Sequence, residues 1–457
     1  MATARPASAH LSAIKTVPIP IVTERPPLSA SFSAFSVHNF RVFASSQLVA
    51  NTALWMQRIA QDWLVKDLTG SAAAVGFTVF IQFLPMLVLG LYGGVIADRY
   101  SKRTLLMITQ GTAALLAAVL SVLALSGGVQ VWHVYLVALL LGLVTVVDNP
   151  TRQAFVTELV GTRHLKNAIS MNSSIFQIGG LIGPALSGVL MGTVGAGWAF
   201  ALNAIACLGV VGALTLMRTG ELNRIEPAPR ARGQLREGLR YVLSKPAIFW
   251  SVIMAGFIAV FAMGMPVLLV AFADDIFNTG AKGYGLFNSL VALGALAGAL
   301  ISTRIFRVRL RAVVLTALGF GLAEIIASTL TAHNAFASAL IAIGLLNLVF
   351  LTSANSLVQM SSNASIRGRV MSVYILVLLG GQAIGGLVIG NLSEWLGPQG
   401  AMTIAGAVPL LAALTIAIIL SRSGQLRLRF SRHPRDRFIA IVPSSAAGAA
   451  DERTTVS

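Results

Sequence analysis

The sequence predicts an all-α membrane protein whose twelve transmembrane helices form two six-helix bundles. Of its 457 residues, 56% are hydrophobic and only 11% are charged, and the mean hydropathy is +0.80. A typical soluble domain has about 25% charged residues, so this chain has too little polar surface to cover a core in water. The apolar residues also gather into twelve stretches, which one polar break divides into six and six.

Each stretch is close to the roughly 20 residues that cross a bilayer as a helix. Helix is expected because every backbone N–H and C=O needs an internal partner in lipid. The first bundle, predicted over 39–217, takes the stretches 40–66, 72–97, 104–126, 131–149, 166–192 and 198–217. The second bundle, predicted over 247–421, takes 247–272, 284–306, 312–331, 336–358, 369–392 and 401–420.

Three polar segments flank or join the bundles. Residues 218–246 begin as a Pro/Arg-rich linker, "RIEPAPRARG". They end in "QLREGLRYVLSKP", where Leu235, Leu239 and Val242 at helical spacing predict a short helix on the membrane surface. Residues 1–38 and 422–457 are predicted to be disordered tails, and the second of them is basic.

Basic residues predict the orientation of the chain. If the N-terminus is cytoplasmic, the cytoplasmic loops carry most of the Lys and Arg residues, and the outer loops carry only Lys66 and Lys282. This bias is typical of the positive-inside rule, so both termini are expected in the cytoplasm. The net charge of +17 then reports topology, with anionic lipid headgroups as its partner. No stacking motif or soluble basic domain indicates nucleic acid.

The two halves show an internal repeat. With a shift from Asn167 to Arg369, "NAISMNSSIFQIGGLIGPALSG" lies over "RVMSVYILVLLGGQAIGGLVIG". The matched glycines are Gly179 with Gly381, Gly183 with Gly385, and Gly188 with Gly390. Chance similarity of glycine-rich helices is the alternative. Duplicated halves with a site between them are typical of secondary transporters.

The loop after the second span, "GGVIADRYSKR" at 93–103, sets Asp98 beside Arg99, Lys102 and Arg103. Gly90, one turn before Gly94, would let another helix approach closely. A carboxylate is unfavourable at a helix C-terminus, so Asp98 needs a cation or another helix N-terminus as its partner.

This loop resembles the signature of the major facilitator superfamily. Gly94, Asp98, Arg99, Lys102 and Arg103 match, whereas Ser101 stands where the family usually has glycine. The resemblance implies that Asp98 latches the cytoplasmic ends of the two halves in one state and releases them in the other. A loop that only sets topology is the alternative.

The fifth span resembles a second signature, which many exporters of the family carry. The matching residues are Gly179, Gly183, Pro184 and Gly188, and Ser187 stands in place of one glycine. "DNPTRQAFVTEL" and "IRGRVMSVY" resemble the branch that includes the enterobactin exporter and macrolide efflux proteins. The family's helix-four arginine motif is not evident in residues 139–155. The resemblance implies alternating access in the inner (plasma) membrane of a bacterium.

The first span carries the candidate transport residues. Gln47, Asn51, Trp55, Arg58 and Asp62 recur at spacings that place them on one face of a helix. Such a face in lipid must meet a cavity or another helix. Arg58 and Asp62, one turn apart, could pair. A role in proton coupling or gating and an ion pair at the outer rim are both open.

Weaker candidates lie in other spans. Glu324 in the ninth span is a further candidate for coupling. Amides that could line a cavity are Gln82, Gln177, Asn288, Asn347, Asn355 and Gln382, and aromatic residues that could stack on a cargo are Trp55, Phe80, Phe83 and Phe257. Asp148 and Arg152 are expected to brace the end of the fourth span.

The sequence predicts a transporter rather than an enzyme. It contains no H-E-x-x-H, G-x-S-x-G or G-x-x-x-x-G-K-[ST] motif, and the single cysteine excludes a cysteine cluster. No metal or cofactor is expected. We therefore expect a monomeric secondary active transporter that exports a small drug-like or siderophore-like amphipathic molecule by antiport with protons or another ion. A facilitator or importer is the alternative, and a lipid enzyme is a remote one.

Overall fold

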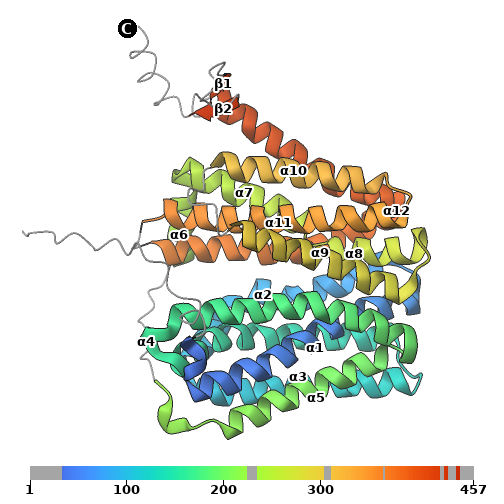
Figure 1. The fold of residues 1–457 in the computed structure, drawn as a ribbon, viewed down its shortest axis with the longest axis vertical. Coiled ribbons are helices and arrows are strands. Elements are labelled where there is room, and N and C mark those ends of the chain that lie inside the picture. The colour runs from blue at the N-terminus through green and yellow to red at the C-terminus, as the bar shows by residue number, and fades with distance from the viewer. Residues whose placement is uncertain are drawn as a thin grey trace, which may run out of the picture.

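The computed structural model describes residues 33–223, 234–302, 310–363, 366–422, 427–430 and 439–442. These residues form helices and one antiparallel hairpin, in which β1 (Arg427–Phe430) pairs with β2 (Ile439–Val442). Figure 1 shows two helical bodies side by side, an N-terminal half from blue to green and a C-terminal half from yellow-green to red. The predicted all-α fold of two bundles is confirmed.

The N-terminal half contains α1 (His38–Thr69), α2 (Ala72–Arg99), α3 (Lys102–Leu125), α4 (Val131–Val194), α5 (Ala196–Leu216) and the 3-10 helix η2 (Thr219–Glu221). The C-terminal half contains α7 (Pro246–Phe261), α8 (Met265–Ala271), the π-helix η3 (Phe272–Ile276), α9 (Gly280–Ser302), α10 (Leu310–Ser328), α11 (His333–Ser361) and α12 (Arg367–Arg422). Within the described residues, ten helices are long and apolar enough to cross a membrane. The polar α1 is long enough but is not among them.

Two glycines divide the longest helices. Gly161 inside α4 has φ +63°, and Gly397 inside α12 has φ +72°. Glycine adopts this left-handed conformation without a steric penalty, so the chain reverses at each position between two crossings. The predicted loop at 150–165 is therefore mostly helix. Counted with these turns, α4 holds the fourth and fifth predicted spans and α12 holds the last two.

The seventh span is broken, although the sequence predicts one helix over 247–272. α7 ends at Phe261 and α8 begins at Met265, and the N–H of Met265 donates to the carbonyl of Ala262 at 3.2 Å. Pro266 has no N–H for a bond to the Ala262 carbonyl, and Gly264 adds backbone freedom. Together they explain the break.

The glycines of the fifth span are packing surfaces. A Cβ added at Gly179 or Gly183 would meet α1, within 2.6 Å of a Trp55 atom in the second case. One added at Gly188 would meet α9, within 3.0 Å of Gly285. The fifth span therefore contacts its own half on one face and the other half on the opposite face.

The matched glycines of the eleventh span do the same. A Cβ at Gly385 would lie 2.2 Å from the Val260 carbonyl oxygen of α7. One at Gly390 would lie within 3.2 Å of Gly76 in α2 of the other half. Equivalent glycines thus make equivalent contacts in both halves, which supports the repeat rather than chance similarity.

The segments outside the bundles differ from plain tails. Residues 33–36 form a 3-10 turn, and the N–H of Ala34 donates to Oδ1 of Asn167 at 3.2 Å. The start of the structure thus packs on the N-terminal half. β1 and β2 form a hairpin within the second predicted tail. Residues 1–32 and most of 423–457 lie outside the described residues.

A helix forms where the surface helix is predicted, as α6 (Gln234–Ser244). Its Leu239 and Leu243 are exposed together with Arg236 and Arg240. A Cβ at Gly238 would lie 2.6 Å from the Arg369 carbonyl oxygen, so α6 packs against the start of α12. Its place on the membrane surface stays a prediction.

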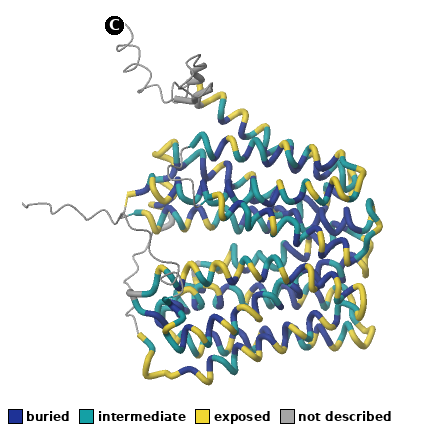
Figure 2. The backbone as a smooth tube through the Cα atoms, viewed as in Figure 1, coloured by how far each residue is buried: buried dark blue, intermediate teal, exposed yellow. Residues whose placement is uncertain are grey.

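The outer faces of the bundles are apolar. Val88, Leu115, Ile205 and Leu411 are each more than half exposed. Figure 2 shows buried residues inside each bundle and exposed residues on its outward faces. Soluble proteins rarely expose so much apolar surface, so lipid is the solvent that these faces require.

Candidate transport site

A cavity of about 300 Å³ lies between the two halves. Its walls come from α1, α2 and α4 of the N-terminal half and from α8, α9, α11 and α12 of the C-terminal half. The broken seventh span contributes Ala262 and Met263. The lining residues with polar atoms are Trp55, Arg58, Asp62, Gln82, Gln177, Asn288, Asn347 and Gln382. Because apolar side chains such as Phe83 and Leu269 form the rest, the lining is amphipathic.

Arg58 reaches this cavity between two aromatic rings. Its guanidinium carbon lies 5.2 Å from the ring centre of Trp55 and 5.8 Å from that of Phe83. Its Nε atom is buried and has no hydrogen-bond partner among the described residues. The expected ion pair with Asp62 is not formed, since no Asp62 oxygen lies within 4.0 Å of an Arg58 nitrogen. Arg58 therefore presents its charge to the cavity.

Asp62 is directed to the other half instead. The hydroxyl of Tyr284 on α9 donates to Asp62 Oδ2 at 3.0 Å. Tyr284 is fully buried and stacks on Trp63, with ring centres 6.4 Å apart. This hydrogen bond joins a titratable carboxyl in α1 to the C-terminal half.

Gln47 and Asn51 belong to the predicted face of α1 but do not line the cavity. Gln47 accepts a hydrogen bond from Arg152 of α4. Asn51 packs against Gly179, where an added Cβ would lie 3.0 Å from the Asn51 backbone. The face thus changes from a contact between helices to a cavity wall along α1.

Asp148 and Arg152 form a buried network inside the N-terminal half. Asp148 Oδ1 accepts from the Thr109 hydroxyl at 2.7 Å and from Gln110 at 2.8 Å, and its Oδ2 accepts from Arg152. The network joins α1, α3 and α4. It braces this bundle, as the sequence predicts for the acid and the arginine.

Five of the six predicted cavity amides line the cavity, and Asn355 instead accepts from Gln359 in its own helix. Of the aromatic candidates, Trp55 and Phe83 line it. Phe80 stacks on Phe77, and Phe257 is partly exposed.

Glu324 lies in α10, away from the cavity lining. It is 0% exposed, and neither carboxyl oxygen has a hydrogen-bond partner among the described residues. A Cβ added at Gly406 would lie 2.9 Å from the Glu324 Cβ, so the side chain leaves α10 beside α12.

The loop at 98–103 is tied to its own half. Lys102 forms an ion pair with Glu158 at 3.2 Å, and Arg103 donates to the carbonyls of Leu214 and Thr215 at 2.7 and 3.2 Å. Asp98 is partly buried near the end of α2, and Arg99 is exposed.

The closest glycine contact of this segment is at Gly93. A Cβ there would lie 1.8 Å from the Val146 carbonyl oxygen of α4, whereas one at Gly90 would meet only Met86 of its own helix. The expected close approach therefore occurs one residue before Gly94, which is itself partly buried.

The two halves are joined at one end by contacts that the sequence analysis did not predict. We call the end where α1 begins the basic end. Lys66 near the opposite end of α1 is 4% exposed, and its Nζ donates to both Asp275 oxygens at 2.9 and 3.0 Å. The N–H of Ala73 donates to Glu394 at 3.3 Å nearby. The sequence places Lys66 and the pair Asp274–Asp275 on the same predicted side of the membrane, and this opposite charge could have indicated the contact.

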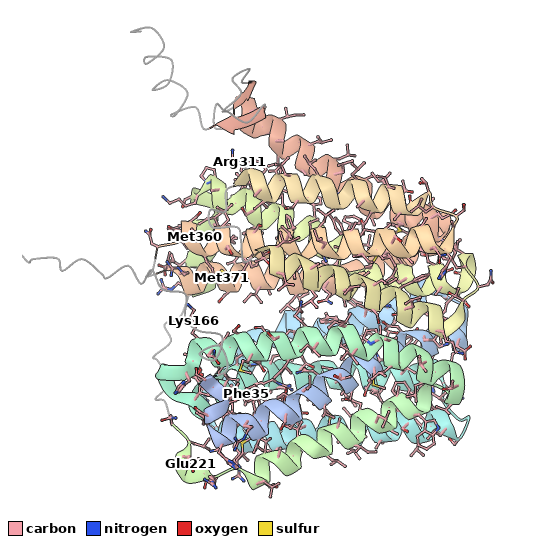
Figure 3. All side chains as sticks on the ribbon, viewed as in Figure 1. Phe35, Lys166, Glu221, Arg311, Met360 and Met371 are labelled. Carbon is pink, nitrogen blue, oxygen red and sulfur yellow. The ribbon has the colours of Figure 1, made fainter. Side chains whose placement is uncertain are left out.

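The glycine contacts between the halves, of α2 with α12 and of α4 with α9, also lie toward this opposite end. Figure 3 shows the basic end, where Lys166 belongs to the N-terminal half and Met371 to the C-terminal half. The ribbons of the halves are more widely separated there than at the opposite end (Figure 1).

Residues 29–438 match the protein family described as transmembrane secretion effector. The enterobactin exporter EntS of Citrobacter koseri is 26% identical over 402 residues, covering 86% of this chain and 94% of the exporter. EntS of Salmonella typhimurium is 25% identical over 401 residues, with 86% and 94% covered.

Solved structures share the fold. The nucleoside transporter NupG matches with a TM-score of 0.67 at 12% identity, covering 84% of this chain and 99% of NupG. A bacterial homolog of the human lysosomal transporter Spinster, inward-facing and unoccupied, matches with a TM-score of 0.63 at 14% identity, covering 84% and 95%. At such identities the likeness establishes the fold alone.

Proposed function

We propose that this chain, which belongs to the transmembrane secretion effector family of the major facilitator superfamily, exports a small amphipathic molecule by alternating access. The observation that carries the proposal is the amphipathic cavity between the halves. A cargo that must be reachable from each side of the membrane in turn would bind there, because movement of one half against the other changes which side can reach it.

Family membership makes the chain a multi-pass membrane transporter and not an enzyme. The curated relatives named above are exporters, which supports export of a drug-like or siderophore-like molecule. A facilitator or importer of a small metabolite is the alternative direction. We place the protein in a bacterial inner membrane with both termini in the cytoplasm. A monomer suffices because one chain supplies every wall of the cavity.

Alternating access requires contacts that hold one end closed and can be broken. Lys66 with Asp275, and the hydrogen bond from Ala73 to Glu394, hold the opposite end together. The carboxylates around Lys66 are nearly half exposed, so water can replace them when the halves separate. We assign these contacts to the state that is open toward the basic end.

We assign proton coupling to Asp62. The charged or titratable groups that face it are Arg58 on its own helix and Tyr284 on α9, and the lining from α2, α4, α8, α11 and α12 is uncharged. Protonation would weaken the charge-assisted hydrogen bond from Tyr284. Since this bond joins the halves, a change of about 1 kcal/mol would bias two states that differ by a few kcal/mol.

Asp98 is proposed as the latch at the basic end, as the family resemblance implies. In that role it would bind the C-terminal half only when the basic end is closed. Its neighbours Lys102 and Arg103 bind the loop to α4 and α5 of its own half in the present structure. Asp98→Asn should therefore slow transport and leave its dependence on the gradient intact.

The test is uptake of a panel of amphipathic fluorescent dyes into inverted membrane vesicles, with and without an acidic lumen. We expect gradient-driven uptake by the unmodified chain, its loss in Asp62→Asn, and its retention in the control Glu324→Gln. Uptake that ignores the gradient would exclude proton antiport, and uptake only from the opposite face would favour an importer. Gradient-driven uptake in Asp62→Asn would move coupling to another carboxyl, with Glu324 first.

A further inference from the structure

We infer that the central cavity recognises an anionic group on a planar aromatic cargo, and that Arg58 is the residue that binds this group. The inference rests on the proposed function and adds the chemical class of the cargo. Two aromatic rings flank the guanidinium group of Arg58, and no described anion contacts it.

The charge of Arg58 is not neutralised by contact within the described residues. Asp62, the only carboxylate in the cavity lining, is hydrogen-bonded to Tyr284 and makes no ion pair with Arg58. A cation held away from water inside a membrane protein normally pairs with an anion or lines a functional pathway. Asp62 still acts on this charge through space, but no described anion contacts the guanidinium group.

The donors of Arg58 are also free. The contacts with Trp55 and Phe83 use the charge of the guanidinium group against the ring faces. They do not use its N–H groups, and no hydrogen bond from Arg58 to a described residue is present. The planar fork can thus donate two parallel hydrogen bonds to a carboxylate or a sulfonate.

The surroundings of Arg58 select the remainder of the cargo. In the part of the chain that the structure describes, Trp55 Nε1 is a second buried donor without a partner. Asn347 Oδ1, across the cavity, is a buried acceptor without one. Aromatic rings flank the guanidinium group, and uncharged amide side chains line the rest of the polar cavity wall. An aromatic anion would stack on the rings while its acidic group meets the fork, whereas an aromatic cation would meet Arg58 as a like charge.

The test compares naphthalene-2-carboxylate with naphthalene-2-carboxamide, which has the same shape without the charge. Binding of both to the purified protein is measured by titration calorimetry in nanodiscs of zwitterionic lipid, with empty nanodiscs as the blank. We expect the unmodified protein to prefer the carboxylate by roughly tenfold or more. Arg58→Gln should abolish the preference, and Arg58→Lys should keep a smaller one because the fork is lost.

Arg218→Gln is the matched control, since it removes an exposed arginine at the basic end and should keep the preference. Equal binding of the two probes to the unmodified protein, no binding of the carboxylate, or a preference that survives Arg58→Gln would each overturn the inference. The unmodified protein decides the first two even if a variant fails to fold. If dyes are taken up but the carboxylate is not preferred in binding, the inference about the cargo is wrong and the proposed export is kept. If the carboxylate is preferred but no dye is taken up, the inference is kept and the proposed export is wrong.

Discussion

At the scale of single residues, Arg58 and Asp62 lie one turn apart on α1 and have different partners. Arg58 lies between Trp55 and Phe83 in the cavity, and Asp62 accepts a hydrogen bond from Tyr284 of the other half. In the roles proposed above, Arg58 binds the cargo and Asp62 carries the proton.

Two other buried carboxyls should differ in how much stability is lost when their charge is removed. Neither carboxyl oxygen of Glu324 has a hydrogen-bond partner among the described residues. Glu324→Gln should therefore change the free energy of unfolding by less than about 0.5 kcal/mol. Asp148→Asn should lower it by about 3 kcal/mol, because Arg152 then stays buried without its anion. Thermal unfolding in lipid measures both. Equal effects would contradict these assignments.

At the scale of helices, close contact between backbones at glycine holds the bundles and their interface together. The fifth and eleventh spans each contact their own half and the other half through matched glycines. Lipid offers no hydrophobic gain for helix association, so close packing of this kind supplies much of it. The faces between halves must also separate during transport.

Gly183→Ala and Gly385→Ala should each lower the free energy of unfolding by about 1–3 kcal/mol. The new Cβ atoms would lie 2.6 Å from Trp55 and 2.2 Å from the Val260 carbonyl, so a helix must move. Gly111→Ala is the control, because its added Cβ would have no described atom within 4 Å apart from neighbouring backbone atoms of its own helix. It should be neutral or slightly stabilising. A loss as large in the control would contradict the packing account.

Sequence predicted the spans well because lipid imposes length and apolarity on each one. It missed the break at 262–264, although Gly264 and Pro266 were its visible causes, because hydropathy averages over such details. The polar face of α1 predicted Arg58 and Asp62 as cavity residues. It could not show that Gln47 meets Arg152 instead, since that depends on how neighbouring helices are packed.

At the scale of the whole molecule, the cavity lies between halves that touch at the end opposite the basic one. Lys66 contacts Asp275 from more than two hundred positions away, so no local pattern could pair them. An exporter must open this end and close the other in turn. We propose that the two halves rock about the cavity in this way.

Distances between paired spin labels at the two ends of the molecule measure this movement. Labels at Lys166→Cys and Met371→Cys report the basic end, and labels at Thr69→Cys and Trp395→Cys report the opposite end. Both pairs are built on Cys207→Ala, since Cys207 is the only cysteine. Lys66→Met should raise the population that is open at the opposite end about fivefold, for loss of about 1 kcal/mol. The control is Lys245→Met, which removes an exposed lysine at the basic end.

If the halves rock, acidic buffer and Lys66→Met should each change the two distances in opposite senses, one lengthening as the other shortens. Two distances that stay fixed under every condition, or that lengthen and shorten together, would contradict this movement.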